Sequence, residues 1–456
     1  MREWYLGRSH TMRRILIAIA VVVAVIVAAG LWIVTGPGPL AFAQGEKVAL
    51  SDYKGADPTG VPASLKTASL VERGAWLAKA ADCEVCHTAK GGTPYAGGFA
   101  FTLPFGTIYS PNITPDKETG IGNWTDAQFL NAVHKGLDDE GQHLYPAMPY
   151  ASFTRITDAD ALAIKAYLFS LPPVHADIPD NTLRFPFNQR WLMGVWNLFF
   201  AADERFRPDT AQSPQWNRGA YIAEALAHCG ECHTPRNLAF ALDNRRKFAG
   251  EVNAGWRAYN ITNDSATGIG AWSDNQLFDY LSSGHAMGHG TAAGPMGEAV
   301  DQSFSRMPPE DIHALVAYLR SIPAETSDLP ALAPPAPASP KEGVAIADAR
   351  GKEIYEGACA SCHSWTGISA ITPYATLTGA RAVNDPGGGN VAQAVIAGVH
   401  RSSLDGDVAM PSFGAAYSDA EIAAVANYVT ARFGARPSNL TAHDVAALRK
   451  AVAQPD

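Results

Sequence analysis

The sequence predicts an all-α protein with three tandem domains of similar construction, preceded by an N-terminal membrane-spanning helix. Three observations support this fold class. The pentapeptide Cys-x-x-Cys-His occurs three times and uses all six cysteines of the 456-residue chain. Each copy lies between segments with the apolar periodicity of helices, and the order of these segments repeats. An uncharged run of twenty residues near the N-terminus is long enough to cross a bilayer.

The three pentapeptides indicate covalent attachment of three haem c groups. In this chemistry two thiols bond to the vinyl groups of one haem, and the adjoining histidine binds its iron. A redox dithiol or half of a zinc site would explain one isolated Cys-x-x-Cys, but not three distant copies that always carry the histidine. The domains are therefore predicted to be class I cytochrome c domains. The predicted attachment residues are Cys83, Cys86, Cys229, Cys232, Cys359 and Cys362, and the iron-binding histidines are His87, His233 and His363.

A methionine thioether is the common sixth iron ligand in haems that transfer electrons. Unit one offers Met148, in Tyr-Pro-Ala-Met-Pro-Tyr, and unit three offers Met410, in Ala-Met-Pro-Ser-Phe. Each precedes a proline and the last helix of its unit. His134 and His143 are the alternatives in unit one, but they lack this local pattern.

Unit two leaves the sixth ligand open between two methionines. Met296 follows the second cysteine motif at nearly the spacing found in unit one. Met307 shares the Met-Pro dipeptide but lies further along, at the start of the last helix. The spacing favours Met296, with Met287, His285 and His289 as more distant alternatives. If every iron carries both ligands, no catalytic residue is expected, and the chain moves electrons.

The domain organisation follows from the repeats and from the linkers between them. In the first two units the pentapeptide is followed by Asn-Ile-Thr and by Gly-Ile-Gly-x-Trp, which indicates duplication of one domain. All three units end on an amphipathic helix containing a tyrosine, at 157–171, 308–322 and 418–433, which is expected to pair with the first helix. The predicted boundaries are 1–43 for the membrane anchor or signal segment, 68–178 for domain 1, 179–212 for an aromatic connector, 213–324 for domain 2, 325–342 for a Pro/Ala-rich linker, 343–436 for domain 3 and 437–456 for a C-terminal tail.

The N-terminal run Ile15–Val34 indicates how the chain is placed in the cell. Four arginines precede this run, so the positive-inside rule places the N-terminus in the cytoplasm and the body outside. A cleaved signal peptide is the alternative, because Ala41-Phe42-Ala43 resembles a cleavage site, although the run is longer than a usual signal core. Both interpretations place the body on the periplasmic side of the cytoplasmic membrane, where haem c is attached.

Two connectors differ sharply in composition. Residues 323–340 contain six prolines, and this semi-rigid tether allows the third unit to be placed separately. Residues 185–200 contain two tryptophans and four phenylalanines with a single charge, which suits either a buried segment between domains or a surface helix lying on the membrane or a partner. Because the net charge is −9 and no basic stretch is present, nucleic acid is not expected as a partner.

These motifs resemble those of the tri-haem cytochrome c subunits of bacterial membrane-bound periplasmic dehydrogenases. The resemblance covers residues 70–433 and includes the aromatic connector and Gly294-Pro295-Met296. It implies three axial pairs on the irons, which are His87/Met148, His233/Met296 and His363/Met410.

The resemblance also implies an electron-transfer role. Members of this family accept electrons from a dehydrogenase catalytic subunit of molybdenum, PQQ or flavin type that oxidises alcohols, aldehydes or related small organics. They pass the electrons to ubiquinone, and the aromatic connector is expected to contact membrane lipid. A subunit that feeds a terminal oxidase without a dehydrogenase partner is the leading alternative. A haem peroxidase with an open iron site is a different class.

Overall fold

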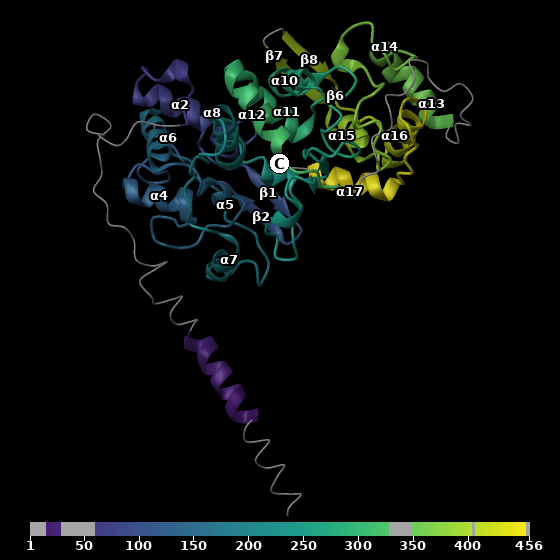
Figure 1. Cartoon of the computed structure of the whole chain (residues 1–456). Coiled ribbons are helices and arrows are strands. Elements are labelled where there is room, and N and C mark those ends of the chain that lie inside the picture. Colours follow the sequence, from purple (N-terminus) through teal and green to yellow (C-terminus); the bar gives the residue numbers. More distant parts are fainter. Residues whose placement is uncertain (1–14, 29–59, 328–348, 404–405, 453–456) are drawn as a thin grey trace, which may run out of the picture.

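The computed structural model describes residues 15–28, 60–327, 349–403 and 406–452. Its body consists of three mainly helical units that lie side by side, with unit one at the left of Figure 1, unit two in the centre and unit three at the right. The helical content agrees with the predicted class. The described residues also form four two-stranded antiparallel sheets, short hairpins that the sequence did not indicate.

Unit one is built on two helices, α2 (Leu70–Ala80) and α6 (Asp158–Ser170). Ser69 caps α2 through a capping box with Glu72, and Thr157 caps α6 by accepting from a backbone N–H. Helix α6 lies within the predicted range 157–171 and is one residue shorter at each end. The other elements are η2 (Ala63–Leu65), α3 (Cys83–Cys86), β1 (Ala100–Leu103), β2 (Gly106–Tyr109), α4 (Asp126–Lys135) and α5 (Tyr150–Phe153).

Unit two repeats this plan with additions around its second half. Its first helix, α8 (Pro214–Tyr221), continues into a π-helical turn, η3 (Ile222–Leu226), and its last helix is α12 (Pro309–Ser321). The other elements are α9 (Gly230–His233), η4 (Asn244–Arg246), β3 (Glu251–Asn253), β4 (Trp256–Ala258), α10 (Asp274–Ser283), β5 (His285–Ala286), β6 (Gly290–Thr291), α11 (Gly294–Gln302) and η5 (Phe304–Arg306).

Unit three is shorter, and it includes the segment that was expected to be a tail. Helix α17 (Ala442–Val452) packs on α15 and α16, and its Val445 is fully buried in the core of the unit. The other elements are α13 (Ala349–Ile354), the π-helical turn η6 (Tyr355–Cys359), α14 (Ala360–His363), η7 (Pro373–Ala375), α15 (Gly389–Ala397), β7 (Val399–Ser403), β8 (Gly406–Met410) and α16 (Asp419–Phe433).

The first and last helices of each unit cross at a glycine. At each crossing a side chain on the glycine would collide with an alanine carbonyl oxygen of the other helix, so only glycine allows this approach. The distance from an added Cβ to that oxygen is 1.9 Å for Gly74 and Ala163, 1.9 Å for Gly219 and Ala314, and 2.2 Å for Gly351 and Ala424. The predicted pairing of first and last helices therefore occurs in all three units.

Units one and two share one hydrophobic core, whereas unit three has its own. The shared core joins Leu77 of α2 to Ile222 and Leu315 of unit two, all of them fully or almost fully buried. A separate cluster in unit three surrounds Ile422 and Tyr355. Burial of apolar surface therefore holds the first two units together as one body.

The third unit docks directly on the second, so the separate placement that the tether would allow is not what the described residues show. Asn390 of α15 accepts from the backbone N–H of Arg257 at 2.8 Å and donates to its carbonyl oxygen at 3.0 Å. Helix α11 also packs against β7 and α15. The composition of the tether could not predict these contacts, because they are made by residues that precede and follow the tether in the sequence. Residues 328–342 of the predicted linker lie outside the described residues.

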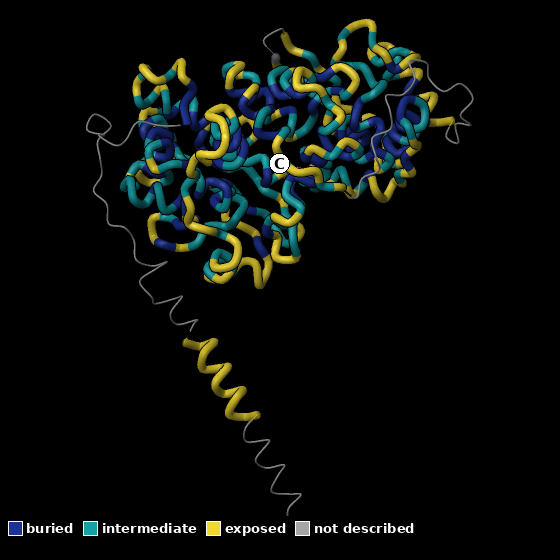
Figure 2. Tube along the Cα trace, in the orientation of Figure 1, coloured by how far each residue is buried: buried dark blue, intermediate teal, exposed yellow. Residues whose placement is uncertain are grey.

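The aromatic connector lies on the surface and forms α7 (Leu192–Phe200), at the lower edge of the body in Figures 1 and 2. One side of α7 is anchored, since Trp196 donates to Ala239 O at 2.8 Å and Asn197 accepts from Tyr150 OH at 2.7 Å. The other side is open to solvent, with Leu198 68% and Phe199 71% exposed. These exposed side chains exclude the prediction that residues 185–200 are a buried segment between domains.

The N-terminal apolar run is described only in part. Residues 15–28 are helical and exposed, while residues 29–34 of the predicted span lie outside the described residues. Among the helices of the described residues, none is long and apolar enough to cross a membrane.

Candidate haem-binding sites

The cysteines of the three pentapeptides lie at the ends of the first helices, on the short helices α3, α9 and α14 or directly before them. None of the six forms a disulfide. Burial raises the pKa of Cys83, Cys86 and Cys229 to about 12 and that of Cys232 and Cys359 to about 11. A redox dithiol needs a lowered thiol pKa, so these sites do not suit that chemistry.

The three histidines are held in the same way. Their Nδ1 atoms lie within hydrogen-bond distance of a backbone carbonyl oxygen: His87 to Pro111 at 2.8 Å, His233 to Tyr259 at 2.6 Å and His363 to Ala375 at 2.6 Å. A carbonyl oxygen only accepts, so Nδ1 carries the proton and Nε2 presents its lone pair. Burial lowers the pKa of all three rings, which keeps them neutral. A neutral, oriented imidazole is the form that binds iron.

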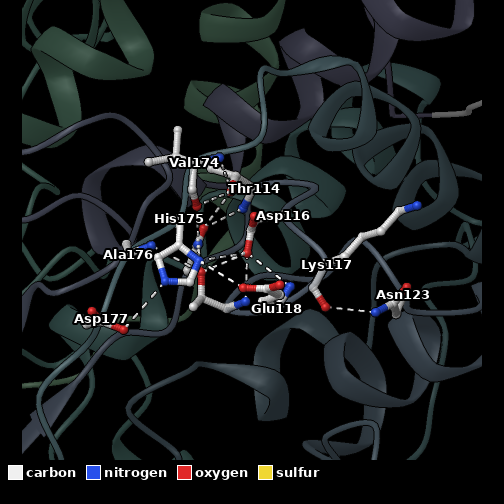
Figure 3. A network of polar contacts seen from close by, with 11 residues as sticks. Thr114, Asp116, Lys117, Glu118, Asn123, Val174, His175, Ala176 and Asp177 are labelled. Carbon is white, nitrogen blue, oxygen red and sulfur yellow. Dashed lines mark hydrogen bonds and ion pairs between the residues drawn. The ribbon is translucent and has the colours of Figure 1, made fainter.

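The repeated Asn-Ile-Thr motif fixes the carbonyls that orient the first two histidines. Asn112 directly follows Pro111, and its Nδ2 donates to Val174 O at 2.7 Å and to Thr119 Oγ1 at 3.0 Å. Figure 3 shows the surrounding network, in which Thr114 and Asp116 face the segment Val174–Asp177 that follows α6. The sequence revealed the motif but not this role, because its partners lie about 60 residues away.

The same anchor recurs in unit two. Asn260 directly follows Tyr259, and its Nδ2 donates to Glu325 O at 2.6 Å and to Thr267 Oγ1 at 3.0 Å. Asn260 is 2% exposed, so the polar atoms of its buried side-chain amide need these hydrogen-bond partners. The hydrogen bonds therefore tie each histidine-binding carbonyl to the segment that follows the last helix.

A cavity of about 1160 Å³ runs through units two and three. It exceeds the roughly 300–1,000 Å³ of ordinary small-molecule sites. From unit two it is lined by Cys229, Cys232, His233 and Met296, and from unit three by Cys359, Cys362, His363 and Met410. The cavity therefore brings the predicted attachment and iron-binding residues of two units together in one continuous space. Cys86 of unit one also lines this cavity.

The two methionines considered in unit two occupy different environments. Met296, on α11, lines the cavity together with His233. Met307 is 8% exposed and belongs to the hydrophobic core. Among the alternatives, Met287 is 69% exposed, while His289 stacks on Trp272 with ring centroids 3.7 Å apart.

In unit one, Met148 is half-buried and packs against the shared core. The described residues that line the large cavity include neither Met148 nor His87. The competing histidines have other partners: His134 Nδ1 lies 3.6 Å from Asp158 Oδ1, and His143 Nδ1 lies 3.2 Å from Asn197 Nδ2 of α7. Burial lowers the pKa of His134 to about 4.

The paired thiols, the oriented neutral histidines and the cavity fit haem c, and they define a c-type cytochrome with more than one haem site. The family model described as cytochrome c matches residues 71–172 and 217–323, and that of the cbb3-type cytochrome C oxidase subunit III matches residues 347–429. The chain is 39% identical over 417 residues to the fructose dehydrogenase cytochrome subunit of Gluconobacter japonicus, covering 86% of this chain and 85% of that protein. The chain belongs to the family of cytochrome c subunits of quinone-dependent dehydrogenases.

Other relatives agree with this family. The gluconate 2-dehydrogenase cytochrome c subunit of Pantoea cypripedii is 35% identical over 84% of this chain and 90% of that protein. A nicotinate dehydrogenase polypeptide of Pseudomonas putida is 41% identical over 375 residues, which amount to 81% of this chain but span only 31% of the length of that relative.

Proposed function

We propose that this chain relays electrons from the catalytic subunit of a periplasmic dehydrogenase, through three haem c groups, to ubiquinone in the membrane. The observation that carries the proposal is the continuous cavity, which is lined by the cysteine pairs and histidines of units two and three and by Cys86 of unit one. Haem groups held in one cavity would be neighbours, which favours the transfer of electrons between them. Each haem c, when bound, accepts and releases one electron.

The chain's own residues provide attachment and two axial ligands at each site. We assign the axial pairs as His87/Met148, His233/Met296 and His363/Met410, with the six cysteines as attachment points. The orientation of each Nε2 supports the histidines, and the cavity lining supports Met296 and Met410. With both axial positions filled, these sites bind no substrate, so substrate chemistry belongs to the partner subunit.

The partner is assigned as a dehydrogenase catalytic subunit of molybdenum, PQQ or flavin type that oxidises an alcohol, aldehyde or related small organic. Relatives named as subunits of fructose, gluconate and alcohol dehydrogenases each match at least 84% of this chain. The oxidase-type family model covers only residues 347–429, so the alternative of a subunit feeding an oxidase without a dehydrogenase has narrower support.

The body is assigned to the periplasmic side of the cytoplasmic membrane, in contact with lipid. Support comes from an aromatic patch made by exposed side chains of the connector and of the neighbouring loop. Phe187 of this patch stacks on Phe105 with ring centroids 4.0 Å apart, and Phe105 also contacts Phe240. Aromatic side chains of this kind are favoured at the membrane interface. The patch consists of Phe185, Phe187, Trp191, Leu198, Phe199, Leu238 and Phe240.

The experiment is purification of the tagged chain from native membranes, followed by identification of stoichiometric partners by mass spectrometry. A pyridine haemochrome assay on the same sample counts haem c. We expect three haems per chain, together with one large subunit that carries a flavin, PQQ or molybdenum cofactor and reduces the haems when substrate is added. Recovery with oxidase subunits and no dehydrogenase would support the alternative, and fewer than three haems would refute the count.

A further inference from the structure

A cluster of charged residues lies where units two and three meet beside the cavity. Arg257 and Tyr259 come from unit two, and Arg381 and Asp385 come from unit three. Asp385 Oδ2 lies 3.3 Å from Arg257 Nε and accepts a hydrogen bond from Tyr259 OH at 3.3 Å. The guanidinium of Arg381 lies over the Tyr259 ring, 4.9 Å from its centroid. Arg257, Tyr259 and Arg381 all line the cavity.

The cluster carries a buried positive charge in excess. Arg381 is 9% exposed, and its Nη2 atom is buried without a hydrogen-bond partner among the described residues. Asp385, which is 3% exposed, is already engaged by Arg257, Tyr259 and the backbone N–H of Gly387. The cluster therefore holds two guanidinium groups and one carboxylate, and among the described residues that carboxylate is ion-paired with Arg257 and not with Arg381. Burial lowers the pKa of Arg381 below its ordinary value, and the nearby Arg257 adds to this effect.

An unpaired buried cation is costly, so the position calls for an anion from the cavity. The cavity also contains His233 and His363, the iron-binding residues of two haem sites. Arg381 lines the same cavity as both histidines and contacts the residue that orients one of them. Tyr259, beneath its guanidinium, supplies the carbonyl that holds His233, while Ala375, six residues before Arg381, supplies the carbonyl that holds His363. The anionic groups of haem are its two propionates, and an arginine pairs well with a carboxylate.

We propose that Arg381 binds a haem propionate at the junction of units two and three. The propionate balances the positive charge that remains after Arg257 has paired with Asp385. This inference rests on the proposed presence of haem in these two units. Since Arg381 belongs to unit three but stacks on unit two, the contact also joins the docked units through the bound haem. A positive charge at this position disfavours the oxidised state of the iron, so Arg381 raises the reduction potential of that haem.

The test compares Arg381→Gln, Arg381→Lys and Asp385→Asn in the holoprotein by potentiometric titration and resonance Raman spectroscopy. In R381Q we expect one haem couple to shift to lower potential and the propionate bending band of one haem to move, with the other couples unchanged. D385N removes a negative charge, so the same couple is expected to shift to higher potential. R381K keeps the charge and is expected to move the Raman band with a smaller shift in potential.

The control variant is Arg245→Gln, which also removes one positive charge but at a side chain 87% exposed and paired with Asp243. It should leave every couple in place. If wild-type protein shows three couples and R381Q moves none of them, the inference is overturned while the proposed function stands. Equal shifts in R381K and R381Q would overturn it too, because packing on Tyr259 and not charge would be responsible. Wild-type protein without haem in units two or three would instead refute the proposed function.

Discussion

Arg401 Nη2 of unit three lies 2.8 Å from Asp301 Oδ1 of unit two, and the two side chains form a buried ion pair. Arg401 is 2% exposed and also donates to Ala292 O at 3.2 Å. Asp301 belongs to α11, the helix that carries Met296, whereas Arg401 belongs to the hairpin in which Val399 pairs with Met410. One ion pair therefore connects the two elements that carry the proposed sixth ligands of neighbouring sites.

Replacing Arg401 by Gln is expected to weaken the junction strongly. The change leaves Asp301 buried without its cation, and breaking a buried pair in this way costs roughly 3 kcal/mol or more. Urea unfolding of the holoprotein, followed by circular dichroism, measures the effect. The matched control is Arg350→Gln, whose 2.7 Å pair with Glu421 involves an arginine side chain 54% exposed. Such a surface pair contributes much less to stability than a buried one, so equal losses in the two variants would contradict the prediction.

The two methionines of unit two should behave differently when they are shortened. Met296→Ala opens one iron, so the reduced protein is expected to bind one carbon monoxide per chain and the oxidised protein to lose one methionine–iron charge-transfer band. Met307→Ala removes core contacts and should lower the free energy of unfolding by about 2–5 kcal/mol without carbon monoxide binding. Carbon monoxide binding by M307A alone would reverse the assignment.

Asn260→Ala is expected to perturb only the haem site of unit two. The substitution removes the bonds to Glu325 and Thr267, so the carbonyl of Tyr259 loses its anchor and His233 loses its fixed orientation. We expect one set of axial-methionine proton shifts to move in the NMR spectrum of the oxidised protein, with a loss of about 1–3 kcal/mol in stability. Unit three has no Asn-Ile-Thr motif and serves as the internal reference. A shift in its signals of equal size would argue against local anchoring.

The free energy of unfolding of unit three should fall in acid, because Glu421 then becomes protonated. Hydrogen bonds from Arg350 and from the Ser418 cap lower the pKa of Glu421 from 4.5 to about 2. Between these values the unfolded chain binds the proton and the folded chain does not, so this stabilisation is lost as the pH falls through the window. The difference in melting temperature between wild type and Glu421→Gln should therefore shrink as the pH is lowered from about 5 toward about 2. A difference that is independent of pH would contradict the shift.

Charges placed on the open side of α7 should release the protein from lipid. In the double variant Leu198→Glu/Phe199→Glu, two side chains that would lie in the interface become anionic. We expect flotation with vesicles of phosphatidylethanolamine and phosphatidylglycerol to decrease severalfold. The control is Ile371→Glu in unit three, a side chain that is equally exposed at 70% but lies outside the aromatic patch. An equal decrease in both variants would show a general charge effect.

Much of the fold is encoded in short-range patterns that a single sequence displays. The capping boxes at Ser69, Thr125 and Ser418 mark helix starts, and the pentapeptides mark the thiols and histidines. The rest depends on contacts between distant residues. The pairing of Arg401 with Asp301 arises only when units two and three dock, and α17 packs on helices that lie far from it in the sequence. No local sequence pattern predicts either contact. The spacing predicts Met296 and not Met307 as the sixth ligand, and the two methionine variants test this prediction.

The division of the hydrophobic cores decides which parts of the protein depend on one another. Units one and two are joined by one core and match the same family model, whereas unit three has a separate core and matches a different one. A change that loosens the packing of Ile422 in unit three therefore leaves the apolar contacts between units one and two in place. The third unit is joined to this two-unit body through polar docking contacts and the surface of α11.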